Sequence, residues 1–475
     1  MNCQVPQHID NNKIFIIQRS EIEGRLDPKM ALYNRKVQSS LYPKVRLKDI
    51  IVCKPQYGAG EPGIERKNFT DARYIRITDI DEYGLISHDD LGATANCIED
   101  KYILKENDIL IARSGNTVGK AYIHKSTPYD CFFAGYLIRF IVDKKKALPE
   151  YIFTFTQLNT YKDWVKAVQR PSGQPNINSE EYQSLEIPLP DIGKQHQIVD
   201  IIDSAYLQKQ QKESEAQKLL DSIDEYILNE LGITLPEIKT DLKSRMFLVN
   251  RSELEARLDP YYSQEYFKEA FNALARGNYP LYSIKSLSSL ITSGITPKSG
   301  GEAYTDDKET GIPFIRSGNI DINGNFDFED LLYLKPEIHE TVMKSSQVLK
   351  NDLMIAIVGA TIGQVGIFLD EREANINQAI ALVRLKDGND VQYVKELIKS
   401  QVGQLSLNRL KRPVARANIN LEEISTIKIP LPPFVKQQEI ANHIFAIRQQ
   451  AKQLQEEGKT ILENAKKEVE QMIIG

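Results

Sequence analysis

Cysteine is scarce in this 475-residue sequence: there are four, and all lie in its first third. Cys3, Cys53, Cys97 and Cys131 form no Cys-x-x-Cys pair, and the six histidines are scattered. Structural zinc sites and redox motifs use closely spaced cysteine and histidine residues, so neither is expected here. Free thiols in a reducing compartment are the simplest interpretation.

Long apolar runs are also missing. No stretch approaches the roughly 18 apolar residues that a membrane-spanning helix needs. The opening residues, MNCQVPQHIDNNK, contain no apolar signal-peptide core. Hydrophobic residues make up 41% and charged residues 26% of the chain, which is ordinary for a globular protein with room for two or three domains. We therefore expect a cytoplasmic protein without membrane association.

An excess of positive charge is the third absence. The net charge is −5, which excludes a uniformly basic coat for nucleic acid. A local basic site is compatible with that total, because salt limits the reach of exposed charges to about 8–10 Å.

What the sequence does contain is a repetition. RSEIEGRLDP at residues 19–28 returns as RSELEARLDP at 251–260. Offsets of 232–244 residues indicate two copies of one module, and not a solenoid, whose period would be about 20–50 residues. Four further matches follow in the same order: YIRITDID (74–81) and FIRSGNID (314–321); NDILIARSGNTVGK (107–120) and NDLMIAIVGATIGQ (351–364); NINSEEYQSLEIPLP (176–190) and NINLEEISTIKIPLP (418–432); KQHQIVDIID (194–203) and KQQEIANHIF (436–445).

Each copy has the same predicted order of elements. A short strand (14–17 and 247–249) comes first, and in the second copy Asp259 as N-cap with Pro260 predicts a helix that continues to residue 275. About 140 residues of short β-branched and aromatic runs, broken by Gly, Asn, Asp and Pro, then predict mixed, strand-rich structure. The Ile-Pro-Leu-Pro element closes this part, and the predicted fold class is α+β.

A long helix is predicted at the end of each copy, over residues 194–231 and 436–473. Apolar residues recur there at alternating steps of three and four, which is typical of a coiled coil, although Lys209 and Lys212 interrupt the first stripe and Gly458 fills one place in the second. Each helix would be about 57 Å long. The predicted seam consists of Ile198, Ile202, Leu219, Ile223, Ile440, Ile444, Ile447, Leu454 and Ile461.

Two equivalent stripes can bury each other. A pseudo-two-fold relation between the copies would make the two helices antiparallel, as a rod with one strand-rich domain at each end. The alternative is that each stripe packs on its own domain.

No catalytic constellation is found. GNTVGK (115–120) has three residues between its glycines where a P-loop needs four, and Ala121 follows where Ser or Thr would hold magnesium, so a tight turn between strands is the better interpretation. LPPF (431–434) begins with leucine, which cannot accept the hydrogen bond that an amino-group methyltransferase motif requires. Asp108 and Asp352 precede predicted strands and are interpreted as structural. We therefore expect a binding protein and no metal site.

Two matching segments are rich in basic residues, 399–416 and its first-copy counterpart 161–178. Arg suits guanine and phosphate, whereas Asn and Gln suit adenine, so a DNA-binding interface is one interpretation and a solvated basic face is the other. The candidates are Lys166, Arg170, Gln174 and Asn176 in the first copy and Arg409, Lys411, Arg412, Arg416 and Asn418 in the second.

Turns that follow predicted strands form a second candidate surface. Glycine in these turns would let a ligand approach the backbone, although any one turn taken alone is compatible with an ordinary loop. The framework matches between the copies while the tips differ, which indicates two domains that read different things. The candidates are Arg76, Thr78, Arg113, Ser114 and Lys120 in the first copy and Arg316, Asn319, Thr361 and Gln364 in the second.

The duplicated Ile-Pro-Leu-Pro element with its long heptad helix, as in IPLPPFVKQQEIANHI, resembles the specificity subunit of type I restriction–modification systems. The likeness covers nearly the whole chain. It implies target recognition domains at 1–185 and 236–427, each reading one half of an asymmetric bipartite DNA sequence. It also implies conserved helices at 186–235 and 428–475, which form a coiled-coil spacer and dock partner subunits.

The same resemblance implies a non-catalytic subunit that binds double-stranded DNA and no cofactor. Two adenine methyltransferase subunits would carry S-adenosylmethionine, and restriction subunits would use ATP and magnesium. Lys-Gln at 194–195 and 436–437 replaces the Glu-Gln of many members, which we interpret as leaving the helix start intact. The competing hypothesis is a coiled-coil scaffold whose paired domains bind proteins and not DNA.

Overall fold

The computed structural model describes most of the chain, in two compact units. One unit is Met1–Glu213 with Gln455–Gly475, and the other is Ser214–Leu454. The predicted strand at 14–17, most of the repeated pair at 19–28 and 251–260, and Cys3 lie outside the described residues. The described residues are 28–36, 40–87, 90–169, 175–239, 241, 246–251, 259–298, 301–411 and 417–475.

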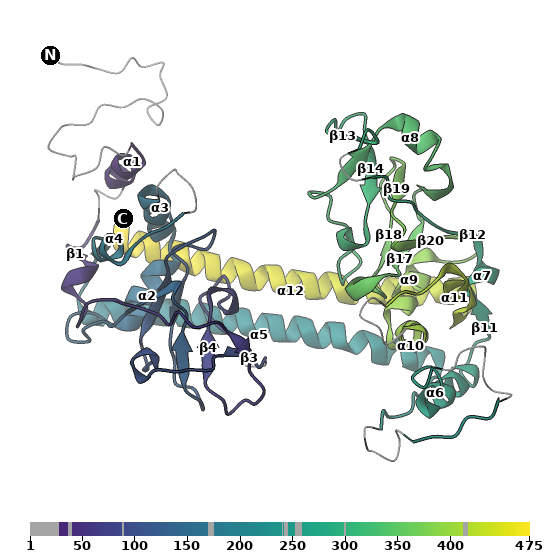
Figure 1. Ribbon diagram of the computed structural model, residues 1–475, viewed down its shortest axis with the longest axis horizontal. Helices are drawn as coiled ribbons and strands as arrows, with labels where there is room; N and C mark the ends of the chain where they lie inside the picture. Colours follow the sequence, from purple (N-terminus) through teal and green to yellow (C-terminus); the bar gives the residue numbers. More distant parts are fainter. Residues whose placement is uncertain are drawn as a thin grey trace. The chain divides into compact units, whose positions relative to one another are not determined.

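The first unit contains two four-stranded sheets with helices packed against one of them (Figure 1). One sheet is antiparallel with the order β2-β9-β6-β7, and the other has the order β3-β5-β4-β8 with β4 and β8 parallel. Tyr151 and Trp164, from two helices, share a core with Ile109 and Ile111 of the first sheet. The elements are α1 (Pro28–Lys36), β1 (Lys44–Arg46), η2 (Leu47–Asp49), β2 (Gln56–Tyr57), β3 (Ile64–Glu65), β4 (Arg73–Ile75), η3 (Ile77–Asp79), β5 (Ala93–Thr94), η4 (Asp100–Tyr102), β6 (Ile109–Ala112), β7 (Ala121–Ile123), β8 (Cys131–Phe133), β9 (Leu137–Phe140), α2 (Pro149–Gln157), α3 (Asn159–Val168), α4 (Ser179–Gln183), β10 (Glu186–Pro188) and the first part of α5 (Ile192–Leu231).

The second unit repeats this arrangement. Its sheets have the orders β12-β20-β17-β18 and β13-β15-β14-β19-β16, and β14 and β19 are again parallel. The elements are α6 (Glu265–Ala275), β11 (Leu281–Ser283), α7 (Ile284–Leu287), β12 (Ser288–Ser293), β13 (Tyr304–Thr305), β14 (Ile312–Ile315), η6 (Ser317–Asn319), β15 (Leu332–Leu334), α8 (Pro336–Glu340), η7 (Lys344–Ser346), β16 (Gln347–Val348), β17 (Leu353–Ala356), η8 (Gly359–Thr361), β18 (Val365–Ile367), β19 (Ala374–Ile376), β20 (Ile380–Leu385), α9 (Val391–Lys399), α10 (Gln401–Leu410), α11 (Leu421–Thr426), β21 (Lys428–Pro430) and the first part of α12 (Phe434–Ile474).

Matching buried acids hold the central strands of both units. Asp108 pairs with Arg139 at 3.4 Å, and Asp352 pairs with Arg384 at 2.7 Å. A carboxylate with so little exposure needs such a partner, because an unpaired buried charge is costly. The structural interpretation of the two aspartates is therefore confirmed.

The two Ile-Pro-Leu-Pro elements are strands β10 and β21, each antiparallel to the first strand of its unit, β1 or β11. Directly after them, Gln195 and Gln437 are buried at the start of the long helices. Gln195 donates a hydrogen bond to Pro190 O and accepts one from Leu148 N, both at 2.8 Å, and Gln437 repeats the two bonds at 2.9 Å. The replacement of Glu-Gln by Lys-Gln thus leaves the helix start intact, as predicted.

The two long helices run antiparallel where they meet in the first unit (teal α5 and yellow α12 in Figure 1). Ala205 of α5 packs with Leu462 and Ala465 of α12, and Lys212 forms an ion pair with Glu457 at 2.8 Å. Residue numbers fall along α12 as they rise along α5, which defines the direction.

The same holds for the helix parts in the second unit. Ala216 of α5 packs with Ala451 and Leu454 of α12, and Lys436 pairs with Glu230 at 2.7 Å. The predicted α+β architecture, with two strand-rich domains and an antiparallel coiled coil, is confirmed.

The nine predicted seam residues all lie on α5 and α12, with buried or half-buried side chains. Ile198 also joins the core of the first strand-rich region, and Ile440 and Ile444 join that of the second. Both alternatives for the stripes are therefore realised: their ends pack on a domain and on the partner helix together. The sequence pattern missed Val469 and Ile473, which are fully buried in the first unit.

Two predictions at the start of the second copy are wrong. Residues 247–249 form no strand, because this run is exposed, with Leu248 fully so, and no described strand lies beside it. The helix predicted from Pro260 begins only at Glu265. The Asp259 carboxylate accepts a hydrogen bond from Tyr261 N at 3.0 Å, which stabilises a local turn in place of a helix N-cap.

Candidate nucleic-acid interface

In each unit, the turn after a central strand lies beside the Asn-Ile-Asn segment. In the first unit Ser114 and Asn176 form an antiparallel bridge, and Ile177 N donates to Arg113 O at 2.9 Å. The second unit repeats the bridge between Val358 and Asn418. The structure therefore brings together the two surfaces that the sequence predicts separately.

Glycines shape these turns. Gly115 and Gly119 have φ values of 79° and 88°, and Gly359 and Gly363 have 76° and 93°, a region that side chains rarely adopt. A Cβ on Gly119 would also lie 2.7 Å from the Val165 side chain. The interpretation of GNTVGK as a tight turn between strands is confirmed.

The Asn-Ile-Asn segment ends in a helix cap in both units. Asn178 accepts hydrogen bonds from Glu180 N and Glu181 N, each at 2.9 Å, and Glu181 reciprocates by accepting from Asn178 N. Asn420 and Glu423 form the same capping box. These caps fix the segment that carries Asn176 and Asn418, whose side chains are exposed.

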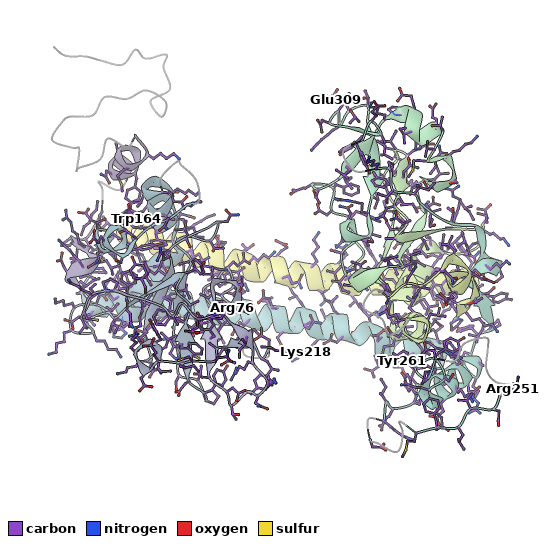
Figure 2. The ribbon with its side chains drawn as sticks, in the orientation of Figure 1. Arg76, Trp164, Lys218, Arg251, Tyr261 and Glu309 are labelled. Atoms are coloured by element: carbon purple, nitrogen blue, oxygen red, sulfur yellow. The ribbon has the colours of Figure 1, made fainter. Side chains whose placement is uncertain are left out.

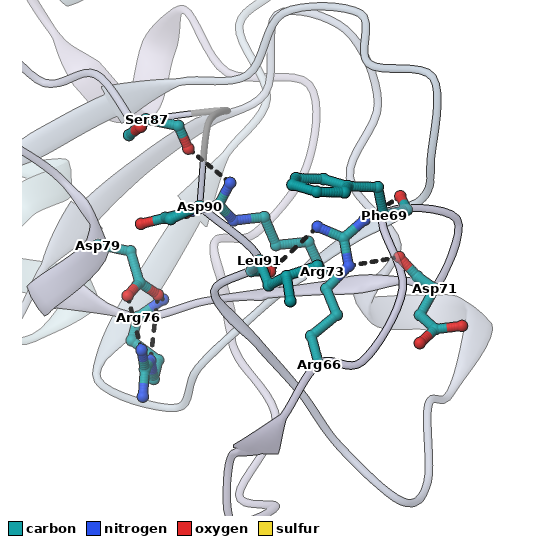
Figure 3. A network of polar contacts seen from close by, with 9 residues as sticks. All are labelled: Arg66, Phe69, Asp71, Arg73, Arg76, Asp79, Ser87, Asp90 and Leu91. Atoms are coloured by element: carbon teal, nitrogen blue, oxygen red, sulfur yellow. Dashed lines mark hydrogen bonds and ion pairs between the residues drawn. The ribbon is translucent and has the colours of Figure 1, made fainter. Parts of the chain in front are cut away.

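Arg76 and Arg316 already have acidic partners. Arg76 contacts Asp79 at 2.8 and 3.1 Å (Figure 3), and Arg316 contacts the Asp330 carboxylate at 3.0 Å. In each pair the carboxylate neutralises the guanidinium, so the net contribution to local positive potential is small. Thr78, between Arg76 and Asp79, is exposed.

Asn319 is a correction to the predicted site. Its side chain is only 3% exposed, its Oδ1 accepts from Arg316 N at 2.9 Å, and its Nδ2 donates to Asp330 O at 3.2 Å. The amide is therefore buried and engaged in holding the turn, and it is not exposed as the prediction requires.

The remaining turn residues are half-buried. Lys120 Nζ donates to Ile80 O and so ties this turn to the end of η3. Thr361 Oγ1 donates to Val358 O at 3.2 Å, and Gln364 Oε1 is buried without a hydrogen-bond partner among the described residues. Thr361 therefore acts within its own turn, whereas Lys120 links its turn to a neighbouring one.

Within their described parts, the two basic segments do not form one free cationic face. Lys166 is exposed on α3, whose Trp164 is buried (Figure 2). Arg409 stacks 3.9 Å above the Tyr262 ring and donates to Tyr262 O at 3.1 Å, and Lys411 donates to Asn408 at 2.8 Å. Burial lowers the pKa of Lys411. Arg170, Gln174, Arg412 and Arg416 lie outside the described residues.

Two further arginines of the first unit, which were not among the predicted site residues, have a structural role. Arg66 and Arg73 are fully buried (Figure 3). Arg66 donates to Asp71 O at 2.8 Å, and Arg73 donates to Ser87 O at 2.5 Å and to Asp90 at 2.7 Å. Both guanidinium groups hold loops, because their donors are directed mainly at backbone carbonyls.

Two tyrosines at the first-unit turn were missed from the sequence. The Arg113 guanidinium lies 4.9 Å from the centre of the Tyr57 ring, and Tyr136, whose backbone bonds to Arg113, is 66% exposed. Each tyrosine adjoins a glycine, Gly58 or Gly135, where the chain approaches another backbone closely. That tyrosine–glycine juxtaposition is the only sequence signal that marks them.

No helix in the described part of the chain is long and apolar enough to cross a membrane. Cys53, Cys97 and Cys131 are free thiols, as predicted.

The chain matches the family described as "Type I restriction modification DNA specificity domain" twice, over residues 45–221 and 266–464. These two matches cover most of the sequence, and each spans one copy of the internal repeat.

Similar proteins include specificity subunits of type I restriction enzymes. The chain is 33% identical to the type I restriction enzyme EcoBI specificity subunit of Escherichia coli over 140 residues, which is 29% of each chain. It is 21% identical to the MjaVIII specificity subunit of Methanocaldococcus jannaschii over 377 residues, 78% of this chain and 79% of that one. A chain solved in work on complex assembly and conformational transition of the type I R-M system has the same fold, with a TM-score of 0.50, 15% identity and coverage of 90% and 95%.

Proposed function

This chain belongs to the family of type I restriction modification DNA specificity proteins, and from that premise we propose that it is the DNA-recognition subunit of a type I restriction–modification complex. It selects the DNA sequence on which partner subunits act. We propose that it performs no catalysis itself.

One observation carries this proposal. The same backbone corner, a strand-following turn bridged to an Asn-Ile-Asn segment, occurs once in each unit. Arg113 and Ser114 stand at this corner in the first unit, and Ile357 and Val358 take their places in the second. Two equal frameworks with unlike side chains suit a target made of two different half-sites, because base edges are discriminated by side chains.

The partners follow from the proposal. Two modification subunits that methylate adenine would dock on α5 and α12 and bind S-adenosylmethionine. Restriction subunits would supply translocation and cleavage with ATP and magnesium. The paired helices would serve as the spacer that sets the gap between half-sites.

The net charge of the chain supports the proposal that its DNA affinity depends on these partner subunits. At a net charge of −5 the chain gains little from counterion release, which dominates non-specific DNA affinity. We therefore expect the isolated chain to bind DNA weakly and the assembly with modification subunits to bind it tightly.

The test is to express the chain with its modification subunits in a bacterial host that lacks adenine methylation, and to map modified adenines by single-molecule sequencing. The expected result is an asymmetric bipartite motif that disappears when this chain is omitted. Gel-shift titrations with random and motif-containing duplexes should show sequence preference only for the complete assembly.

The competing scaffold hypothesis predicts a different outcome. Methylation would then be independent of this chain, and no duplex would be preferred at any salt concentration. Either result would reject the proposed role.

A further inference from the structure

The first-unit corner contains an arginine whose surroundings are unlike those of Arg76 and Arg316, which both have acidic partners. Arg113 N donates to Tyr136 O at 2.9 Å, and Arg113 O accepts from Ile177 N at 2.9 Å. These bonds fix the backbone of Arg113 between the β8–β9 connection and the Asn-Ile-Asn segment. We call Tyr57, Arg113, Tyr136 and Asn176 the Arg113 corner.

The Arg113 guanidinium is held in place by an aromatic ring but donates no hydrogen bond within the described part of the chain. It lies over the Tyr57 ring at 4.9 Å, and Tyr57 Oη in turn accepts a hydrogen bond from Ser179 N at 3.1 Å. No carboxylate or carbonyl in the described part of the chain accepts a hydrogen bond from it, and its Nε is buried without a partner. Arg76, by contrast, forks onto Asp79.

The equivalent corner of the second unit has the same backbone pairing but has neither the arginine nor the two tyrosines. Ile357 replaces Arg113, and its N donates to Ala379 O at 2.9 Å, so Ala379 replaces Tyr136. The strand register shows that Ser293 is the second-unit equivalent of Tyr57. In the first unit Ile138 pairs with Tyr57 on one side and with Ile111 on the other. In the second unit Ala381 pairs in the same way with Ser293 and Ile355. Ile357 is buried in the hydrophobic core. At these described positions the two corners share their backbone pairing and differ in their side chains.

The chemistry of the Arg113 corner suits a base edge. A planar guanidinium held against an aromatic ring loses little further freedom when it forms two parallel hydrogen bonds. Guanine offers such a pair of acceptors, O6 and N7, in the major groove. Tyr136 and Asn176 lie on the two segments that are hydrogen-bonded to the Arg113 backbone, and their exposed side chains would restrict which base pair can approach.

We propose that Arg113, supported by Tyr57, reads one guanine in the half-site recognised by the first unit, and that the second unit has no equivalent contact. This inference rests on the proposed function and adds the base and the residue that reads it. A phosphate contact by Arg113 is the competing outcome, since the same fork also suits phosphate oxygens.

The experiment uses the full chain assembled with its modification subunits. R113A and R113K are compared with wild type by methylation mapping and by competition binding with duplexes in which each base pair of the motif is changed in turn. Wild type should prefer guanine at one first-half-site position by about 5- to 150-fold. R113A should lose that preference at that position only, and R113K should lose most of it because an ammonium group lacks the planar fork.

Matched variants separate reading from folding and charge. Y57F retains the ring and should keep the preference, whereas Y57A removes the stack and should reduce it at the same base pair. R46A deletes another half-exposed arginine of the same unit and should leave every preference unchanged. Unaltered thermal unfolding of R113A would show that the unit still folds.

Two results would overturn the inference. An equal loss of affinity for all duplexes in R113A would assign the residue to a phosphate, and an unchanged motif would remove it from the interface. Wild type without any sequence preference would instead reject the proposed function, so the two failures are distinguishable.

Discussion

At the residue scale, one position carries a charge in only one of the two units. Lys399 ends helix α9 where Gln157 ends α2. Burial, assisted by the nearby cation Arg448, lowers the pKa of Lys399 to about 8, and Glu396 opposes the shift only in part. Its Nζ donates to Asn323 O. The second unit therefore holds a cation at a cost that the first avoids.

We predict that replacing Lys399 with glutamine, the residue at the equivalent position of the first unit, raises the free energy of unfolding by an amount that depends on pH. Below pH 8 the folded and unfolded chains both carry the proton, so the cost of burying the charge is fully present. It disappears as pH rises from about 8 to about 10.5, where the unfolded chain also loses the proton. K399Q should therefore be more stabilising at pH 7 than at pH 10 by about 1–2 kcal/mol, allowing for solvent near the amine.

The measurement is chemical unfolding of K399Q and wild type at both pH values. The lost hydrogen bond to Asn323 shifts both comparisons alike, so the change with pH isolates the charge. A difference in stability that does not vary with pH would contradict the argument.

At the scale of elements, the helix pair contains a close approach in the first unit. A Cβ placed on Gly458 of α12 would meet the backbone and side chain of Lys209 in α5 at 3.4 Å, an ordinary contact distance. The lysine and the glycine that interrupt the two apolar stripes therefore face each other. The lysine extends toward Tyr83, whose ring lies 4.2 Å from its Nζ, and it pairs with Glu213.

Gly458 variants should reveal this packing. G458A should stabilise the chain by up to about 1 kcal/mol, because alanine is the better helix former and its methyl group fits. G458L has nearly the same helix propensity but should cost about 1–3 kcal/mol relative to G458A through overpacking. Thermal unfolding of the two variants tests this, and equal stability would show that the helices do not press together at residue 458.

At the scale of the whole molecule, α5 and α12 each contribute to both compact units, with the division at Glu213/Ser214 and Leu454/Gln455. Each unit contains a matched half of each helix. The proposed spacer role depends on this sharing, because a change in helix length affects both units through the same two elements.

Inserting one apolar-patterned heptad into both helices at the division tests the spacer. Seven residues add about 10.5 Å of helix and keep the seam in phase, which corresponds to about three base pairs of DNA. The gap in the methylation motif should lengthen by up to that amount while both half-sites keep their sequences. Modification at the original gap would contradict the spacer role, and a heptad in one helix alone is the control that should disrupt assembly.

The duplication, the strand-rich character of both copies and the two long helices can all be predicted from the amino-acid sequence. Each of these depends on local regularities: offsets near 240 residues, the Ile-Pro-Leu-Pro elements, and apolar steps of three and four. Such patterns reflect backbone geometry, so they are legible without any knowledge of distant contacts. The free state of Cys53, Cys97 and Cys131 and the structural role of Asp108 and Asp352 were also predicted from the sequence.

Which polar side chains keep donors available for a ligand depends on contacts between residues that are far apart in the sequence. Arg316 and Asn319 are bound by Asp330, and Arg409 is stacked on Tyr262. Arg113, which the sequence does not distinguish from them, is stacked on Tyr57 and has no acceptor among the described residues. Whether a hydrogen-bond donor is occupied depends on the acceptors that folding brings close to it. Such an acceptor can be distant in the sequence, because Tyr262 lies 147 residues from Arg409 along the chain.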